Sequence, residues 1–150
     1  HAMDHDNKIP AAYLDASLTD LDESSYWFKV YDDYISEKAL YELLTCPNAE
    51  GYLPEGNRTC YGMNELLAPQ GAPYWKLNQL TDPSRTLVLG DTPINPSWKS
   101  GGSVLKPNAE SNTSSPAFRE SGNTAAILFA DGHVKLLEKD QLSNDMFTIN

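Results

Sequence analysis

The sequence predicts an α+β domain made of one helical region, short strands and a late β-hairpin, which long loops connect. Two apolar runs, at 125–130 and 133–137, flank the turn dipeptide Asp131-Gly132. Further upstream, apolar residues recur at three- and four-residue spacing between residues 24 and 44, which is the spacing of a helix face. Ten Pro and nine Gly among 150 residues indicate that much of the remaining chain is irregular. A chain of this length forms a single domain with its own core.

The helical region is predicted to start at Ser24-Ser25 and to end before Pro47, because the residue before a proline avoids helical backbone. Its second part, Glu37–Leu44, keeps the same apolar spacing. Aromatic rings at helical spacing in its first part predict a face turned toward the core. The alternative is an aromatic stripe that binds sugar. These rings belong to Trp27, Tyr31 and Tyr34.

The two cysteines of the chain predict a disulfide bond. Cys46 and Cys60 bracket a segment rich in Pro, Gly and Asn. Two cysteines this close in an acidic, turn-rich chain predict a disulfide and therefore an oxidising compartment. Closing a loop of this length stabilises a fold by about 3 kcal/mol in the chain-entropy description. The alternative is a pair of reduced thiols in the cytosol. A zinc site has little support, because no CxxC pair is present and the histidines lie far away in sequence.

The dipeptide Asp131-Gly132 predicts a two-residue type I′ turn, which needs positive φ at both central positions. Asp tolerates that conformation and Gly adopts it without a steric penalty. We expect this hairpin at the centre of the sheet. Its second strand is expected nearer water, because His133 and Lys135 alternate there with Val134 and Leu136. The neighbouring Asp and His also fit a catalytic or metal site, but turn chemistry alone accounts for them, and one His supplies too few ligands for a metal.

Two more short strands are expected. The apolar run Thr86–Asp91 should pair with the hairpin, and a strand is expected around residues 60–63. The stretch 92–123 is predicted to be an interaction loop or a disordered one. Residues 138–150 are predicted to be a polar tail with a few apolar anchors.

The charge and the missing motifs exclude several classes of function. A net charge of −10 and a pI of about 4.5 disfavour binding to nucleic acid and to anionic lipid. The G-x-S-x-G and H-E-x-x-H motifs are absent, and the chain has only three His as general bases. We therefore predict that the protein is not an enzyme and has no catalytic residue or cofactor. The cluster Asp4-His5-Asp6-Asn7 starts like a calcium loop but lacks its Gly and distal Glu, so it is predicted to be a solvated chain end.

Several sequence pieces stand in an order that resembles a known family. That family is the pseudopilin-like, prepilin-type bacterial proteins with a C-terminal signature of His, nine residues and then Asp-Gly. In this chain Ser121 stands at the position of that His, so the signature is incomplete. The pieces that carry the resemblance are Asp4–Pro10, Thr45–Pro47 followed by Tyr61–Asn64, Asp82–Asp91, and Phe129–Val134.

The resemblance implies a pilin-like head, with a helix packed on a small antiparallel sheet and long decorated loops. It also implies a basic leader and a long apolar helix ahead of Asp4–Pro10, which spans the membrane before assembly and lies in a filament core afterwards. The opening His1-Ala2-Met3 resembles a remnant of tag removal. Residues 1–150 are accordingly expected to be one globular head from which the N-terminal transmembrane helix was removed.

The function that the resemblance implies is a non-enzymatic structural subunit of a pseudopilus or type IV pilus-like assembly linked to type II secretion. The full-length protein would be anchored in the inner membrane with its head outside the cytoplasm. Its partners would be other pilin-like subunits, bound through the missing helix, and secreted cargo. Calcium held by a carboxylate cluster is a secondary expectation, since heads of some relatives carry such a site. The alternative function is an extracytoplasmic carbohydrate- or ligand-binding module that uses the rings of Tyr52, Tyr74, Trp75 and Trp98.

Overall fold

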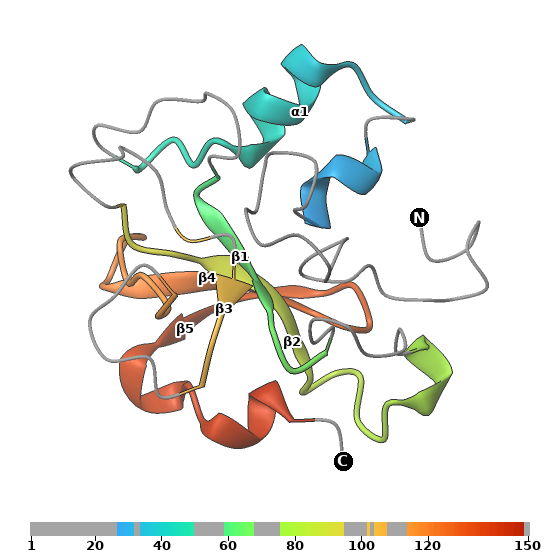
Figure 1. Ribbon diagram of the computed structural model, residues 1–150. Coiled ribbons are helices and arrows are strands. Elements are labelled where there is room, and N and C mark those ends of the chain that lie inside the picture. Colours follow the sequence, from blue (N-terminus) through green and yellow to red (C-terminus); the bar gives the residue numbers. More distant parts are fainter. Residues whose placement is uncertain are drawn as a thin grey trace, which may run out of the picture.

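The structure, a computed structural model, is a five-stranded sheet with helical segments on both of its faces (Figure 1). It describes residues 27–31, 34–49, 59–67, 76–94, 102, 104–107 and 114–148. The strands are β1 (Tyr61–Asn64), β2 (Leu87–Asp91), β3 (Val104–Leu105), β4 (Thr124–Phe129) and β5 (Val134–Glu138). The α-helix is α1 (Glu37–Leu44), and the 3₁₀ helices are η2 (Trp27–Tyr31), η3 (Leu77–Gln79), η4 (Lys139–Gln141) and η5 (Asn144–Phe147). The chain is therefore of the α+β class.

The sheet has the strand order β3-β1-β2-β4-β5. Its pairs β1–β2, β2–β4 and β4–β5 are antiparallel, but β3 runs parallel to β1, so the sheet is mixed and not purely antiparallel as expected. The predicted strand near residues 60–63 is β1, and the predicted pairing of residues 86–91 with the hairpin is confirmed by β2 and β4. The expected central position of the hairpin is wrong, because β2 is the middle strand and β5 forms an edge. The two-residue strand β3 lies inside a stretch that was predicted to be loop.

The reversal between β4 and β5 is a three-residue loop. The N–H of Phe129 donates to the His133 carbonyl at 2.9 Å, and the N–H of Gly132 donates to the Phe129 carbonyl at 3.0 Å. Gly132 has a φ of +94°, whereas Asp131 is not among the residues with positive φ. This is a turn followed by a glycine in the left-handed region, so the two-residue type I′ prediction is wrong. The Asp131 carboxylate instead accepts the His133 N–H at 3.1 Å, an Asx-type contact that holds the turn.

The helical region consists of two separate pieces. Ser36 has extended backbone angles and its hydroxyl accepts the Ala39 N–H at 3.3 Å, so it caps the N-terminus of α1. Of the rings predicted to face the core, Trp27 is buried and packs edge-on against Tyr31. Tyr34 is 46% exposed and lies outside the core, whereas Tyr31 and Ile35 pack against it. Among the described residues, η2 and α1 are therefore not one continuous helix, because the extended Ser36 precedes α1. The predicted start at Ser24-Ser25 lies outside the described residues.

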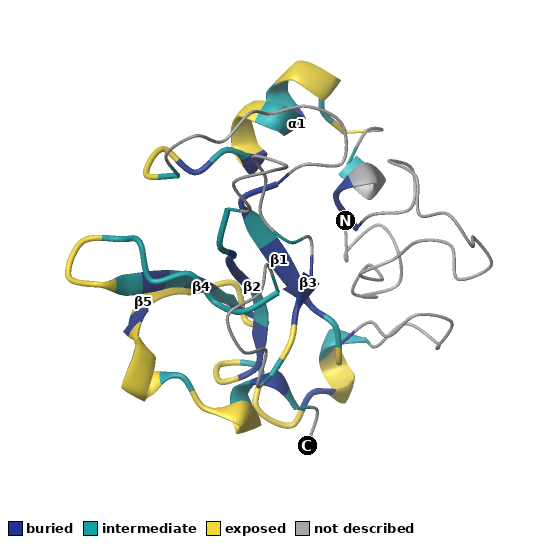
Figure 2. Cartoon of the chain, turned by 60° about the vertical axis from the view of Figure 1, so that its left-hand side comes forward, coloured by how far each residue is buried: buried dark blue, intermediate teal, exposed yellow. Residues whose placement is uncertain are grey.

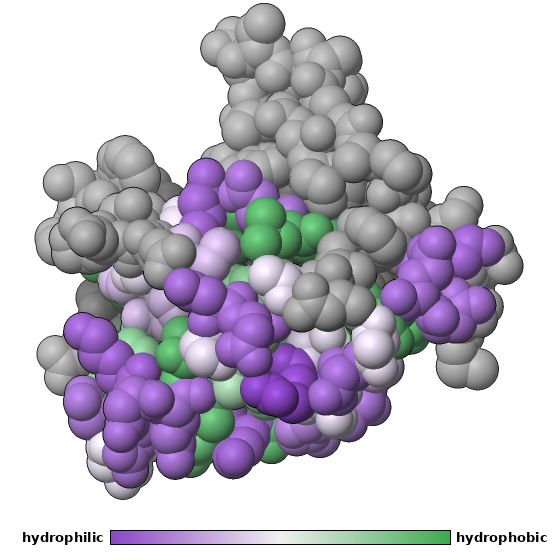
Figure 3. Space-filling view, turned by 90° about the horizontal axis from the view of Figure 1, so that it is seen from below, coloured by the Kyte–Doolittle hydropathy of each residue, from purple (hydrophilic) through white to green (hydrophobic). Residues whose placement is uncertain are grey.

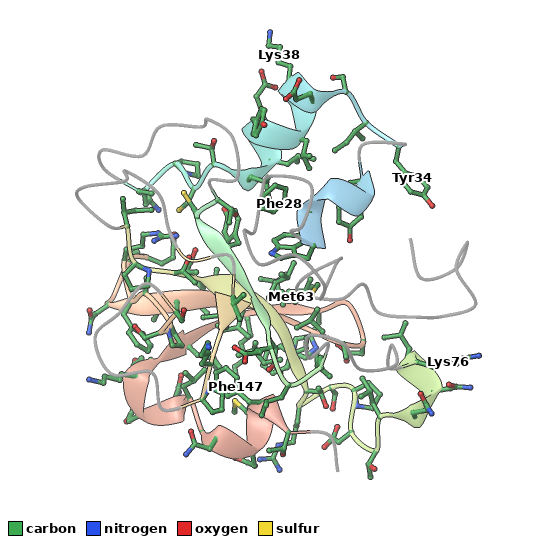
Figure 4. The ribbon with its side chains drawn as sticks, in the orientation of Figure 1. Phe28, Tyr34, Lys38, Met63, Lys76 and Phe147 are labelled. Atoms are coloured by element: carbon green, nitrogen blue, oxygen red, sulfur yellow. The ribbon has the colours of Figure 1, made fainter. Side chains whose placement is uncertain are left out.

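Each face of the sheet has its own core, and Figure 2 shows the buried residues in the middle of the molecule. On the α1 side the core consists of Trp27, Phe28, Leu40, Leu44, Met63 and Val104. On the other side it consists of Leu87, Leu105, Ala125, Ile127, Phe129, Leu137 and Phe147. In Figure 4, Phe28 lies between α1 and the sheet, Phe147 lies on the opposite side, and Lys38 points away from the sheet. Seen from below, the described surface is mostly hydrophilic, with hydrophobic residues exposed only in small groups (Figure 3).

The C-terminal segment belongs to the core, although the sequence predicted a polar tail there. Phe147 on η5 is 2% exposed and packs in the second core. Its carbonyl accepts a hydrogen bond from Asn64 Nδ2 at 3.0 Å, and the same amide donates to the Leu87 carbonyl at 2.9 Å. The Leu66 N–H completes the set by donating to Asn64 Oδ1 at 3.1 Å. A fully buried and satisfied asparagine thus ties η5 to the middle of the sheet.

Candidate functional site

A buried polar network lies where four segments of the chain meet. Cys46 follows α1, Cys60 precedes β1, Asp91 ends β2, and Arg119 lies ahead of β4. Both cysteines are buried, the side chain of Arg119 is 14% exposed and that of Asp91 only 1%. We call these four residues and Glu120 the arginine network.

Arg119 connects the members of this network. Its Nη2 donates to Asp91 Oδ1 at 3.0 Å and to the Cys60 carbonyl at 2.8 Å. Its Nη1 donates to the Thr92 carbonyl at 2.5 Å, and its Nε points to Cys46 Sγ at 3.4 Å. The planar guanidinium presents several donors in a fixed fork, so one side chain reaches all of these acceptors. Burial opposes the charge, but the Cys46 side chain and the Asp91 carboxylate outweigh burial and raise the pKa of Arg119.

Asp91 connects the network to β4. Its Oδ2 accepts the Ala126 N–H at 2.8 Å, and its carbonyl accepts the Ala117 N–H at 2.9 Å. Burial raises the pKa of the Asp91 carboxyl, and the Ala126 N–H and the Arg119 guanidinium act in the opposite direction. Desolvation is therefore the largest influence on this carboxylate, as expected for a charge removed from water.

The two cysteines predicted to form a disulfide lie in one buried cluster, together with partly buried Ala49, Tyr61 and Ile94. In the structure both are free thiols. The bond itself therefore stays a prediction, and the structure shows only that the two side chains share one cluster. Burial is the main reason that the pKa of Cys60 is raised. A raised pKa leaves little thiolate at neutral pH, which is the opposite of what a nucleophilic cysteine needs.

One group in the described part of the chain has the composition of a metal site. Ligand atoms of Cys46, Asp91 and Glu120 all lie within 4.8 Å of one another. Each of them is already engaged: Cys46 Sγ lies 3.5 Å from Glu120 Oε1, and Asn48 Nδ2 donates to Glu120 Oε2 at 2.6 Å. Arg119 supplies the positive charge at this place, and three ligands are one fewer than a structural zinc site uses. The geometry therefore favours a structural network over a metal centre.

The tip of the hairpin holds the other predicted site residues. Asp131 Oδ1 lies 2.6 Å from His133 Nδ1, and the His133 ring stacks on Phe129 with ring centres 4.4 Å apart. The His133 N–H and ring lower the pKa of Asp131. Among the described residues no hydroxyl or thiol is hydrogen-bonded to His133, so the pair lacks the nucleophile that a catalytic assignment requires. Ser121, at the position of the signature His, lies in an exposed turn beside Gly122 and Asn123, both at positive φ.

Other predicted site residues lie outside the described part of the chain. They are the cluster Asp4–Asn7, which was predicted to be a solvated chain end, and the rings of the alternative sugar-binding function, Tyr52, Tyr74, Trp75 and Trp98.

The sequence did not single out Asp91, Arg119 or Glu120. One signal was available for Asp91, because a carboxylate directly after an apolar strand run must find a partner if the strand is buried. Nothing local marks Arg119, which stands in a stretch predicted to be loop.

Comparisons with protein-family models, with curated proteins and with solved structures found no match to this chain. None of the helices in the described ranges is both long and apolar enough to cross a membrane.

Proposed function

We propose that the protein is the head of a pilin-like structural subunit, without enzymatic activity, in a pseudopilus or type IV pilus-like assembly linked to type II secretion. The proposal rests on the resemblance of the ordered sequence pieces to that family. One structural observation supports it: pieces that are far apart in the sequence form one connected unit.

The contacts between these pieces are direct. In β1 and β2, Gly62 pairs with Gly90. The Asp131 N–H at the hairpin tip donates to the Pro83 carbonyl at 3.2 Å, and the Ala130 N–H donates to the Thr86 carbonyl at 2.9 Å. The pieces Tyr61–Asn64, Asp82–Asp91 and Phe129–Val134 therefore make one side-by-side arrangement, as expected if they specify a single scaffold.

The chemistry of the arginine network also favours a structural role. Asp91 is buried, Arg119 is mostly buried, and both are bonded to each other and to backbone groups, so their polar atoms are engaged within the protein. The Cys60 thiol has a raised pKa, which lowers its reactivity. Groups arranged in this way hold together the four segments that meet at the network.

The test is the N-terminus of the protein as its native host makes it. We expect mass spectrometry of the purified full-length product to find a prepilin-type cleavage followed by a methylated residue and an apolar helix. A cleaved secretory leader and a freely soluble product would contradict the proposal. That outcome would favour the alternative, an extracytoplasmic carbohydrate- or ligand-binding module.

Localisation outside the cytoplasm has a separate test in the two cysteines. We expect the protein isolated without reductant from its native host to carry a Cys46–Cys60 bond, seen as a loss of two hydrogens in the intact mass. Reduction should restore the mass of the dithiol. Two free thiols in the native protein would refute the extracytoplasmic assignment.

A further inference from the structure

The loop that joins β4 to β5, at one end of the sheet, contains the peptide bond Asp131-Gly132 (Figure 1). An aspartate followed by glycine is the aspartyl dipeptide most prone to isomerise, because glycine has no Cβ to keep its nitrogen away from the aspartate side chain. The side chains of Asp131 and His133 are 39% and 43% exposed. A Cβ added to Gly132 would meet no atom within 4 Å. Water and room for a change of backbone are therefore both present at this bond.

The isomerisation needs no reagent except water. The Gly132 nitrogen attacks Cγ of the protonated Asp131 carboxyl, so that a C–N bond forms. The hydroxyl of the carboxyl leaves as water together with the proton of the nitrogen, and a five-membered succinimide remains. Water then opens the ring. Opening at the α-carbonyl gives isoaspartate, whose main chain runs through Cβ and Cγ, and opening at the other carbonyl restores aspartate, so the mass of the chain stays the same.

One contact at the tip turns the reacting atoms toward each other. The His133 N–H donates to Asp131 Oδ1 at 3.1 Å. The ring that this hydrogen bond closes contains both Asp131 Cγ and the Gly132 nitrogen. The aspartate side chain is therefore folded back along the peptide bond to Gly132, which is the direction that the attack requires.

Other contacts at the tip oppose the attack. The Gly132 N–H donates to the Phe129 carbonyl at 3.0 Å, and the Asp131 N–H donates to the Pro83 carbonyl at 3.2 Å. The Gly132 nitrogen must give up its bond to Phe129 and turn before it can reach Cγ. Both sides of the reacting peptide unit are thus held by hydrogen bonds to other parts of the fold.

His133 opposes the reaction at the carboxyl. Its Nδ1 lies 2.6 Å from Asp131 Oδ1, and its ring is held in place by stacking on Phe129 with ring centres 4.4 Å apart. The His133 N–H and ring lower the pKa of Asp131. The carboxylate is thereby kept in the ionised form, which has no hydroxyl to lose as water.

We propose that Asp131 is a site of spontaneous conversion to isoaspartate, and that the folded hairpin tip suppresses this conversion through His133 and the hydrogen bond from Gly132 to Phe129. Isomerisation then proceeds only from molecules whose tip has opened locally. This inference goes beyond the proposed function and does not depend on the pilin-like assignment.

The product does not fit the native tip. Isoaspartate adds one carbon to the main chain of a three-residue loop and carries its carboxylate directly on Cα. The carboxylate consequently loses its present geometry toward His133. The Ala130 and Asp131 N–H groups, which donate to the Thr86 and Pro83 carbonyls at 2.9 and 3.2 Å, lie next to the added carbon. Isomerisation should therefore weaken the contact between the hairpin and the segment ahead of β2.

The experiment compares the full chain with the peptide acetyl-Leu-Phe-Ala-Asp-Gly-His-Val-Lys-amide, which has the sequence of residues 128–135. Both are incubated in the same mildly acidic buffer, and electron-transfer fragmentation distinguishes isoaspartate from aspartate. The folded chain should form isoaspartate at residue 131 at least tenfold more slowly than the peptide, and the chain unfolded in urea should match the peptide. Asp140 is an internal control, because it is exposed but followed by Gln141, and it should stay aspartate in every sample.

The matched protein variants are His133→Ala at the tip and Lys135→Ala, an exposed residue farther along β5. His133→Ala should raise the rate in the folded chain at least threefold, and Lys135→Ala should leave it unchanged. The same His→Ala change in the peptide, where no fold holds the tip, should alter the rate less than twofold. Retained hydrogen-exchange protection in β2 shows that the variants are folded.

The proposal is overturned if the folded chain isomerises less than tenfold more slowly than the peptide, or if neither the peptide nor the unfolded chain forms isoaspartate at residue 131. An increase of less than threefold in folded His133→Ala overturns the role of His133. The isomerised chain, separated by chromatography, should exchange its Ala130 and Asp131 amides faster than the original chain. Unchanged exchange at these amides would overturn the effect on the tip.

Discussion

Replacing Arg119 by Met tests the arginine network most directly. The substitution keeps an unbranched side chain of similar length but removes the donors to Asp91 Oδ1 and to the carbonyls of Thr92 and Cys60. Asp91, with a side chain 1% exposed, would then hold a buried charge without its partner. Breaking a buried pair in this way costs about 3–5 kcal/mol. We expect the lower part of this range, because the Ala126 N–H still binds the carboxylate.

The assay is equilibrium urea unfolding followed by tryptophan fluorescence, with reductant present so that both cysteines stay thiols. The matched control is Arg85→Met, which removes an ion pair to Asp145 of similar length, 2.8 Å, but with side chains 62% and 53% exposed. Exposed pairs contribute about 0–1 kcal/mol. Both variants lose one arginine, so the difference between them isolates the effect of burial.

A double-mutant cycle with Asp91→Asn measures the interaction between Arg119 and Asp91 separately from their other contacts. Asp91→Asn alone should cost less than Arg119→Met, because Arg119 keeps the two carbonyl acceptors. In the double variant no unpaired charge is buried, so we expect it to be more stable than Arg119→Met alone. If the free energies of unfolding of Arg119→Met and of the Arg85→Met control differ by less than about 1 kcal/mol, the network does not stabilise the fold and the reasoning is refuted.

Three further predictions concern single residues. Gly62→Ala should destabilise the fold by about 1–3 kcal/mol, because the added Cβ would lie 2.8 Å from the backbone carbon of Val104. Gly90→Ala should cost less, because its Cβ meets the side-chain Cδ1 of Ile127, at 2.6 Å, which can move. Urea midpoints of the two variants compare these costs. Asn64→Leu leaves the carbonyls of Leu87 and Phe147 without their donor, and each unsatisfied carbonyl should lower the stability by about 1–3 kcal/mol. We therefore expect η5 to lose hydrogen-exchange protection first. Unchanged protection of η5 would contradict its attachment to the sheet through Asn64. The His133 N–H and ring lower the pKa of Asp131 in the folded protein below its ordinary value of 3.8. The stability that the Asp131 carboxylate contributes is therefore complete above pH 3.8 and is lost as the pH falls through the folded pKa. In Asp131→Asn, this part of the acid dependence should disappear from unfolding curves.

The elements that the sequence predicted are those with a local signal. β1, β2 and the hairpin were expected from short apolar runs, and the pairing of β2 with β4 followed from their composition. β3 has only two residues, so no alternation was visible in it. The turn type was mistaken because Asp131 prefers a side-chain contact to His133 over positive φ.

The arginine network could not be predicted because its contacts are long-range. Arg119 reaches Asp91 across 28 positions and Cys46 across 73. No spacing rule links such residues, and the segment around Arg119 has a composition typical of a loop. The cysteines were found because their type alone suggests a pair, although nothing in the sequence shows that an arginine lies between their segments.

The buried network and the last strand of the described sheet are connected through β4. On one side Ala126 of β4 donates to Asp91, and on the other side β4 is the only strand of the described sheet that pairs with β5. A change that loosens Asp91 therefore removes a support of the strand that holds β5 in place. We expect Arg119→Met, under conditions where it is still folded, to raise hydrogen exchange along β4 and β5 more than along β1. Equal exchange in the three strands would show that the network stabilises the cysteine loop alone and does not help to hold β4 and β5.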